Sequence, residues 1–355
     1  MKGIILHGGH GTRLRPLTQT GPKQLLPVAN KPISQYALED LRDAGIKDIA
    51  IVVGDLYPEK VKEYYGDGKK FGVDITYIHQ ERPLGIAHAV SLCKDFIGNQ
   101  PFVVYLGDNM LKGGISDFVK SFENSELESL ILLCRVKNPQ QFGVAKLNSK
   151  GKLTGLVEKP NRPPSEYALT GIYFFRPRIF GIIEKLRPSW RGELEITEAI
   201  QLLMENEGKV DYRFVKGWWK DTGTCEDILH ANRLVLDEMK PEIWGRVEDR
   251  RSISGKVKIE KRAIIKKGAR VLGPSIVGEG VIIEKGAIVG PYASIGNESV
   301  LKGGIIENSI IMEHCVINVK KKIINSIIGR YSEIILSKKR RDMNFIVGER
   351  SNIKL

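Results

Sequence analysis

The sequence lacks any long apolar run. A helix needs about 20 mostly apolar residues to cross a bilayer, and no stretch of the 355 residues approaches that length. The N-terminal run Met1–Leu6 stops at a Gly-rich stretch after a few residues. It therefore predicts a buried first strand rather than a signal peptide, and no membrane partner is expected.

Cysteine is also scarce, and the cysteines are far apart, at Cys93, Cys134, Cys225 and Cys315. No two of them form a Cys-x-x-Cys pair, which argues against a zinc site and against a disulfide framework. This use of cysteine fits a reducing compartment, so we expect a cytoplasmic protein.

Aromatic residues are few where the charge is greatest. Residues 1–245 hold 33 Lys and Arg against 31 Asp and Glu, whereas residues 246–355 hold 22 against 11. A basic domain can bind nucleic acid, but only Tyr292, Tyr331 and Phe345 could stack on bases there. We therefore interpret the excess charge as a solvated surface and expect no nucleic-acid partner.

The first two thirds of the chain alternate short apolar runs with amphipathic stretches. The apolar runs predict buried strands at Gly3–Leu6, Ile49–Val53, Ile75–Ile78 and Phe102–Leu106. The amphipathic stretches predict helices at Pro32–Ala44, Pro58–Tyr65 and Gly85–Phe96. Such alternation implies a layered α/β domain with a mainly parallel sheet, in which ligands bind at the carboxyl ends of the strands.

A period of six residues governs the rest of the chain. Aliphatic residues recur without a gap at Ile253, Ile259, Ile265, Val271, Val277, Ile283, Val289, Ile295 and Leu301. Small residues stand two positions earlier at Ala263, Ala269, Ser275, Ala287, Ala293 and Ser299. A hexapeptide period is the signature of a parallel β-helix with about three hexapeptides per coil. The alternative, a β-sandwich, does not account for nine consecutive matches.

The period slips after Leu301, where Asn308-Ser309-Ile310-Ile311 recurs as Asn325-Ser326-Ile327-Ile328. The basic run Lys320–Lys322 between the two copies is expected to loop outward. From these patterns we predict an α/β domain over residues 1–236, a linker over 237–250 and a hexapeptide-repeat β-helix over 251–355.

The first strand runs into a Gly-rich loop, Gly8-Gly9-His10-Gly11-Thr12-Arg13. Without Cβ atoms, its backbone N–H groups can approach phosphate oxygens closely. The spacing matches neither the dinucleotide fingerprint nor a P-loop, and a tight structural turn remains the alternative. Arg13 and Lys23 follow as two cations that would suit a triphosphate.

A carboxylate follows the fourth predicted strand. Asp108 comes two residues after the end of Phe102–Leu106, at the sheet edge where ligands bind, and a carboxylate there is suited to Mg²⁺. The alternative is a turn or helix-capping Asp. His10 and His88 invite a general-base interpretation, which we discount if the nucleophile is a phosphate, because phosphoryl transfer depends mostly on positioning and charge.

Several motifs together resemble one family. GGHGTRLRPLT and PKQLLPVANKP resemble the signature of sugar nucleotidylyltransferases, also called nucleotide-sugar pyrophosphorylases. In the same order follow Gln80 with LGIA, LGDN, FGV, EKP, TGIY, GELEIT and DTGT. The resemblance covers about residues 1–235 and is closest to long-type glucose-1-phosphate thymidylyltransferases, which have a Rossmann-like mixed sheet and a C-terminal left-handed β-helix. One departure is His7, where the family usually has Ala.

The resemblance implies a role for each matching residue. Asp221 would join Asp108 as a Mg²⁺ ligand, and Gln80 with Gly85 would bind the nucleobase. The phosphates would lie on Gly8, Gly9, Gly11, Thr12 and Arg13. Lys159 would contact the phosphate of the sugar phosphate, and Glu158 the sugar hydroxyls. Gly143 and Thr170 would line the sugar pocket. Glu193 is a weaker sugar-site candidate that could equally cap the following helix.

The implied reaction joins a hexose 1-phosphate to a nucleoside triphosphate and releases pyrophosphate. Arg13, Lys23, Asp108 and Lys159 would be the catalytic residues, Mg²⁺ the cofactor, and glucose 1-phosphate with dTTP or UTP the substrates. A homo-oligomer is expected. Two alternatives stay open. One is an acyltransferase of the hexapeptide type, for which His314 is the only histidine beyond residue 230. The other is a non-catalytic regulatory homologue.

Overall fold

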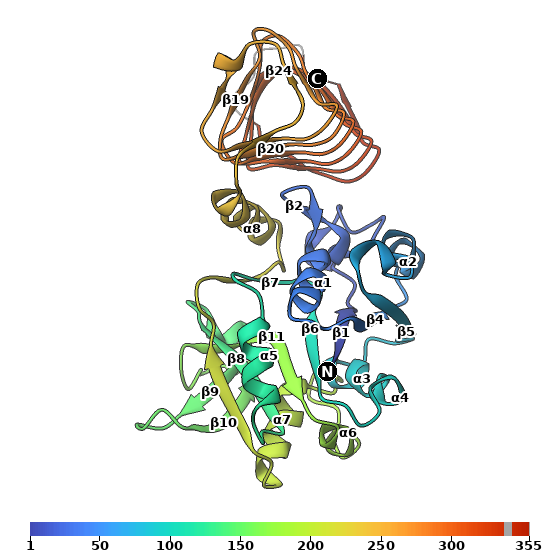
Figure 1. Ribbon diagram of the computed structural model, residues 1–355, viewed down its shortest axis with the longest axis vertical. Helices are drawn as coiled ribbons and strands as arrows, with labels where there is room; N and C mark the ends of the chain where they lie inside the picture. Colours follow the sequence, from blue (N-terminus) through green and yellow to red (C-terminus); the bar gives the residue numbers. More distant parts are fainter. Residues whose placement is uncertain (337–342, 355) are drawn as a thin grey trace. The chain divides into compact units, whose positions relative to one another are not determined.

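The computed structural model describes residues 1–336 and 343–354 (Figure 1). The chain divides into two compact units. One consists of Met1–His10 with Ser34–Asp221, and the other of Gly11–Ile33 with Thr222–Leu355. Within the described part of the chain, no helix has the length and apolar character that crossing a membrane requires.

A nine-stranded mixed sheet forms the centre of the first unit. Its parallel part has the order β6-β1-β4-β5, and β11 joins it antiparallel to β6. All four predicted strands are present in this part, and the fold is Rossmann-like, as expected. The strands are β1 Lys2–His7, β4 Asp48–Val53, β5 Asp74–His79, β6 Phe102–Leu106, β8 Ser129–Arg135, β9 Gly143–Leu147, β10 Leu153–Glu158, β11 Tyr167–Phe175 and β12 Val210–Phe214.

Helices accompany this sheet at α1 Ile33–Asp43, α2 Pro58–Tyr65, α3 Ile86–Ser91, α4 Lys94–Ile97, α5 Ser116–Glu123, α6 Arg178–Ile183 and α7 Ile196–Glu205. The helix predicted over Gly85–Phe96 is wrong as a single element, because the chain forms α3 and α4 instead. The N–H of Cys93 bonds to the carbonyl of Val90, a tight turn that interrupts the α-helical pattern.

The second unit contains a parallel β-helix, which Figure 1 shows as a triangular coil. Val257 pairs with Ser275, and Ser275 with Ala293, a coil of 18 residues or three hexapeptides. The strands are β14 Glu242–Ile243, β15 Arg246–Val247, β16 Ile253–Ser254, β17 Val257–Ile259, β18 Ile264–Ile265, β19 Arg270–Leu272, β20 Ser275–Val277, β21 Ile282–Ile283, β22 Ala287–Val289, β23 Ala293–Ile295, β24 Val300–Glu307, β25 Ile310–Ile311, β26 Val316–Ile324, β27 Ile327–Ile328, β28 Glu333–Leu336, β29 Ile346–Val347 and β30 Asn352–Lys354.

The structure confirms the inward-facing positions that the hexapeptide pattern predicts. The aliphatic residues from Ile259 to Leu301 at this period are fully buried in one core, and Ile253 packs against it half-buried. The small residues that precede several of them are also buried. After Leu301 the coils contain 16 to 19 residues, which agrees with the predicted slip.

Two details differ from the sequence-based expectation. Lys320–Lys322 lies within strand β26 and does not loop outward, although Lys320 and Lys321 are exposed. Much of the expected linker over residues 237–250 belongs to the first coil, because β14 pairs with β17 and β15 with β18. Helix α8, Cys225–Glu238, also includes the first two residues of the expected linker.

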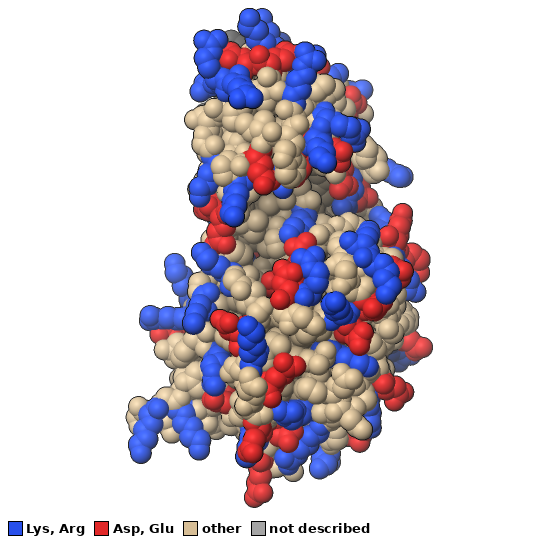
Figure 2. Space-filling model, in the orientation of Figure 1, with Lys and Arg blue, Asp and Glu red and all other residues tan. Residues whose placement is uncertain are grey.

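Ion pairs between coils engage the basic residues of the β-helix. Arg262 binds Glu279 and Glu298, and Arg330 binds Glu313 and Glu349. On the face shown in Figure 2, the Lys and Arg side chains of this domain (blue) lie next to Asp and Glu side chains (red). Uncharged surface (tan) lies between these groups of charges. These observations support the interpretation of a solvated surface.

The early segment Gly11–Ile33 also belongs to the second unit. It forms two short 3₁₀ turns, Thr12–Leu14 and Lys23–Leu25, and a hairpin of β2 Pro27–Val28 and β3 Lys31–Pro32. Strand β2 packs against helix α8 (Figure 1). The segment that contains Arg13 and Lys23 is thus part of the unit that contains the β-helix.

Candidate active site

A small two-stranded sheet brings together the chain segments that carry the two predicted metal carboxylates. Asp108 follows β6, and the next residues form β7, Asn109–Leu111. Strand β7 pairs antiparallel with β13, Trp219–Asp221, and Asp221 lies opposite Asn109. Both Asp side chains are half-buried. The backbone register is therefore compatible with Asp108 and Asp221 binding one metal ion, as the family resemblance implied.

Asn109 orients Asp108, and sequence reasoning gave it no role. Its side chain is almost completely buried. The amide nitrogen donates to Asp108 Oδ1 (2.9 Å), and the amide oxygen accepts from Trp219 Nε1 (2.8 Å). One amide thus links the first carboxylate to the strand that ends at the second. The Asp-Asn pair in the sequence was the only available signal.

These donors fit a magnesium ion. Among the described residues, no group of three or more His, Cys, Asp and Glu side chains could enclose a metal. Mg²⁺ does not require such a cage, because proteins usually bind it through one or two carboxylates together with waters and substrate phosphates. Asp108 and Asp221 would supply such a pair of hard oxygen ligands at the sheet edge.

His7 lies at the end of β1, buried near these carboxylates. Neither ring nitrogen has a hydrogen-bond partner among the described residues. Burial lowers the pKa of His7 to about 3, although the negative charge of Asp108 acts in the opposite direction. The imidazole is therefore neutral at ordinary pH, and this departure from the family adds no charge to the site.

Gln80 follows β5 and is buried next to the glycines of the loop. A Cβ atom on Gly8 would lie 3.3 Å from Gln80 Oε1. The Gln80 amide nitrogen donates to the Gly85 carbonyl (3.3 Å) and lies 2.9 Å from His88 Nδ1. The amide is thus held in one orientation by the Gly85 carbonyl and by His88, which we had considered only as a base.

Gly85 connects this region to the Gly-Glu-Leu-Glu motif. Its φ of 106° favours glycine, and a Cβ atom there would lie 2.5 Å from the Leu194 carbonyl oxygen. The N–H of Leu194 bonds to Leu84 O (2.8 Å), and the N–H of Ala87 bonds to Leu194 O (3.0 Å). The two motifs therefore form one backbone-bonded cluster.

Glu158 and Lys159 lie at the end of β10. Thr197 Oγ1 donates to Glu158 Oε2 (2.6 Å), while Lys159 Nζ and Arg191 Nη1 lie 3.9 and 3.8 Å from Glu158 Oε1. Burial raises the pKa of Glu158, partly offset by the Thr197 hydrogen bond. Lys159 has a left-handed φ of 38°, a conformation that is rare for residues other than glycine and concentrated at functional sites.

Gly143 leaves room for the Thr197–Glu158 hydrogen bond. A Cβ atom on Gly143 would lie 2.6 Å from Thr197 Oγ1 and 3.1 Å from Glu158 Oε2. Gly143 is opposite Glu158 in the pairing of β9 with β10. Thr197 had no predicted role, although it stands in the GELEIT motif.

Thr170 lies in an irregular part of β11, where the pairing with β8 shifts between Leu169 and Tyr173. Such irregularities are frequent next to active sites. Thr170 is fully buried, and its hydroxyl has no partner within the described structure. A Cβ on the next residue, Gly171, would come within 2.9 Å of Asn109, so this stretch adjoins the residue that orients Asp108.

Glu193 is held by an ion pair with Arg191 (2.8 Å). Arg191 also bonds to Glu195, which is almost fully buried and accepts from Ser189 as well. Helix α7 has Glu195 at its N-cap position, so Glu193 is not the capping residue. Glu193 therefore belongs to a charged cluster beside Glu158.

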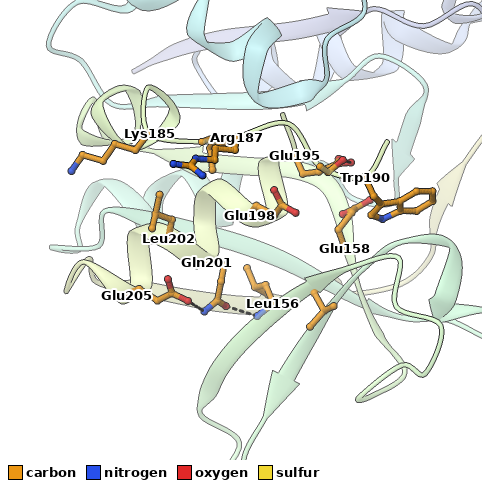
Figure 3. A pocket seen from close by; sticks show the side chains of 13 residues that line it. Leu156, Glu158, Lys185, Arg187, Trp190, Glu195, Glu198, Gln201, Leu202 and Glu205 are labelled. Carbon is orange, nitrogen blue, oxygen red and sulfur yellow. Dashed lines mark hydrogen bonds between the residues drawn. The ribbon is translucent and has the colours of Figure 1, made fainter. Parts of the chain in front are cut away.

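A pocket of about 410 Å³ adjoins this cluster (Figure 3). Glu158, Glu195 and Glu198 contribute carboxylates to its lining, and Trp190, with 86% of its surface exposed, contributes an indole ring. Lys185 and Arg187 line it as well. The pocket thus offers acceptors and an aromatic face on one side of the Glu158 cluster.

The remaining residues of the Gly-rich loop, from Gly11 onward, lie in the second unit. Gly11 has a φ of 59°, and its carbonyl accepts from Thr18 Oγ1 (2.8 Å) and from the N–H of Leu14 (2.9 Å). A Cβ on Gly11 would lie 3.4 Å from Lys23 Cβ, so the loop and this cation are adjacent. Thr12 and Arg13 form the following 3₁₀ turn and are exposed.

Comparison with known proteins identifies the class. The family model described as nucleotidyl transferase matches residues 2–238. A glucose-1-phosphate thymidylyltransferase of Bacillus anthracis, in a crystal structure with sucrose, shares 42% identity at a TM-score of 0.63, over 66% of this chain and 94% of that chain. A UDP-glucose pyrophosphorylase complexed with UDP-glucose shares 26% identity at a TM-score of 0.61, over 67% and 99%.

Full-length relatives extend the match through the β-helix. The low-salt glycan biosynthesis nucleotidyltransferase Agl11 of Haloferax volcanii is 48% identical over 360 residues, covering all of both chains. A glucose-1-phosphate thymidylyltransferase of Streptomyces antibioticus is 43% identical over 357 residues, covering 100% of this chain and 99% of the relative. The chain therefore belongs to the sugar nucleotidyltransferase family, whose substrates are a nucleoside triphosphate and a sugar phosphate.

Proposed function

We propose that this chain transfers a thymidylyl group from dTTP to glucose 1-phosphate in the cytoplasm, with UTP as the alternative donor. The observation that carries the proposal is the pairing of β7 with β13, which sets Asp221 opposite the neighbour of Asp108. The names of the relatives support dTTP and glucose 1-phosphate. The match to Agl11, whose name specifies neither substrate, leaves both to experiment.

The proposed reaction is a single displacement. A phosphate oxygen of glucose 1-phosphate attacks the α-phosphorus of the triphosphate, the bond to the β-phosphate oxygen breaks, and pyrophosphate leaves with both electrons of that bond. The attacking phosphate is a dianion, so no general base is required. Catalysis then consists of alignment and neutralisation of charge.

Each site residue has a role in this proposal. Asp108 and Asp221 would hold Mg²⁺, which when bound neutralises charge on the phosphate oxygens. The backbone of Gly8, Gly9, Gly11 and Thr12 binds phosphates, while Arg13 and Lys23 neutralise the pyrophosphate. Gln80 and Gly85 bind the base, and Lys159 binds the sugar phosphate. The sugar is bound by Gly143, Glu158, Thr170 and Glu193.

We propose a catalytic domain over residues 1–236 and a β-helix domain over 251–355 that mediates assembly of a homo-oligomer. Residues 237–250, which the sequence marks as the connection, contribute β14 and β15 to the first coil. The compact units cut across these boundaries, since Gly11–Ile33 groups with the later part of the chain. An acyltransferase activity has little support, because the ring of His314 is stacked on that of Tyr331 with centroids 4.9 Å apart.

A substrate grid tests the proposal. The four common nucleoside triphosphates and dTTP are each incubated with Mg²⁺ and with glucose 1-phosphate, galactose 1-phosphate or N-acetylglucosamine 1-phosphate. Released pyrophosphate is measured, and the product is identified by mass. We expect the highest kcat/KM for dTTP with glucose 1-phosphate. A preference for ATP or GTP, or for another sugar by more than tenfold, would refute the proposed substrates. Acetyl-CoA turnover by the same preparation would support an acyltransferase.

A further inference from the structure

The hairpin that follows Lys23 has a strained turn. Strands β2 and β3 are joined by Ala29 and Asn30, which have φ angles of 46° and 62°. Two successive left-handed residues make a tight hairpin turn for which Asn and Gly are favoured and Ala is not. A turn of this kind requires support from surrounding groups.

The β-helix and helix α8 supply that support. Asn232 of α8 is fully buried, and its Oδ1 accepts from the N–H of Ala29 (2.8 Å) and from Ser294 Oγ (2.7 Å). Asn30 Nδ2 donates to the Ile295 carbonyl of β23 (2.7 Å). The turn is thus joined to the same β-helix strand through two separate hydrogen-bonded routes.

Apolar contacts surround these hydrogen bonds. Ala29, Leu236 and Ile276 form a small buried cluster, with Met239 and Tyr292 packed against it. A buried amide oxygen without a hydrogen-bond partner is costly. The side-chain oxygen of Asn232 therefore holds both of its donors, the N–H of Ala29 and the hydroxyl of Ser294, in place. The hairpin, α8 and the coils around β20 and β23 therefore form one packed body.

The tethered hairpin is continuous with the cationic segment. The N–H of Leu26 bonds to Lys23 O (3.0 Å), and the N–H of Ile33 bonds to Leu26 O (3.1 Å). Lys23 in turn adjoins Gly11 of the loop. A displacement of the turn would therefore shift the backbone that carries Lys23.

We propose that Asn232, Asn30 and Ser294 are positioning residues for the triphosphate, through which the β-helix sets the geometry of the segment from Gly11 to Lys23. This proposal rests on the proposed function of that segment. It gives the β-helix a part in nucleotide binding in addition to assembly, although it provides no group that touches the substrate.

Two single variants and a matched control test the proposal. Asn30→Gly removes the bond to Ile295 while keeping a residue that tolerates positive φ, and Ser294→Ala removes one bond to Asn232. The matched control is Ser309→Ala, which truncates another buried β-helix serine whose hydroxyl bonds to Glu307 O and to the N–H of Ser326. For each protein we would measure KM for the triphosphate and for the sugar phosphate, the melting temperature, and binding of dTTP alone by calorimetry.

We expect Asn30→Gly and Ser294→Ala to raise the KM and Kd for the triphosphate about threefold or more. Their KM for the sugar phosphate should stay within twofold of wild type, and so should the KM and Kd values of the Ser309→Ala control. Triphosphate values within twofold for both variants, or equal shifts for both substrates, would overturn the proposal. If the wild type binds dTTP without turnover, the proposed function fails and the Kd ratios still decide the inference. If the wild type binds no triphosphate, both fail.

Discussion

Among single residues, Asp108 carries the most direct prediction. Asp108→Asn should preserve the fold and lower kcat/KM by roughly 100-fold or more, about 2.7 kcal/mol, because an amide is a poor ligand for a hard cation. Pyrophosphate release at saturating Mg²⁺ measures the effect. Asp95→Asn, at an exposed position on α4, is the control. More than half of wild-type activity in Asp108→Asn would show that this carboxylate is not a metal ligand.

His7 makes the stability of the protein depend on pH. Its pKa is about 3 in the folded state against 6.5 for the ordinary group, so below pH 6.5 the unfolded chain binds a proton that the folded chain excludes. Stability is therefore lost as pH falls from 6.5 towards 3, by about 2 kcal/mol between pH 6.5 and 5. His7→Ala should remove most of this loss. Urea unfolding at the two pH values tests it.

The control for this measurement is His79→Ala, since His79 lies exposed at the end of β5. We expect that variant to keep the acid sensitivity of the wild type. An equal loss of stability in His7→Ala and wild type over this pH range would contradict the argument from burial.

Gln80 is the residue at which base selectivity should be measurable. A hydrogen bond to a base contributes roughly 0.5–1.5 kcal/mol net, so Gln80→Ala should raise KM for dTTP and UTP about two- to tenfold. It should also blunt selectivity against CTP and change KM for glucose 1-phosphate less. His88→Ala, which frees the Gln80 amide to rotate, should reproduce the loss of selectivity. An unchanged nucleotide profile in Gln80→Ala would refute the assignment.

Between elements, the close approach of β9 to α7 leads to a prediction for Gly143. In Gly143→Ala the added methyl would lie 2.6 Å from Thr197 Oγ1 and would displace the bond from Thr197 to Glu158. We expect KM for glucose 1-phosphate to rise about tenfold, with a smaller change for dTTP. Gly181→Ala on α6, where a Cβ meets nothing within 4 Å, is the matched control. Equal KM values for the sugar phosphate in both variants would contradict the role of this contact.

Regular elements were predictable to the extent that their pattern is local. Helix α2 begins and ends where its Pro and its apolar spacing indicate, and β6 matches its apolar run. The stretch from Gly85 to Phe96 has a helical pattern throughout, yet a turn at Cys93 divides it. Periodicity does not distinguish one helix from two helices that share a buried face.

For the whole molecule, removal of residues 246–355 should disturb assembly and stability more than it lowers kcat at saturating triphosphate. The truncation deletes the β-helix strands against which α8 and the hairpin pack, and exposes Ala29 and Leu236. We expect loss of the native oligomer size and a melting temperature lower by about 5 °C or more. Light scattering and thermal unfolding measure both. A soluble chain with unchanged size and melting temperature would contradict this expectation.

The sequence by itself determined the β-helix and the Gly-rich loop that follows the first strand. A six-residue period fixes which side chains face inward, because each coil stacks on the next in the same register. The loop glycines stand next to the strand that presents them. Both features depend on residues close together in the chain, so they can be recognised without knowledge of distant partners.

Only the tertiary structure decided which distant residues meet. It placed Asp221 opposite the neighbour of Asp108, gave Glu158 its hydrogen bond from Thr197, and joined Ala29 to Asn232. Composition and spacing do not encode such pairs, since a long loop can close between many partners at similar entropic cost. Packing of the whole chain selects among these closures, and the residues that we propose to position the triphosphate segment lie at such contacts.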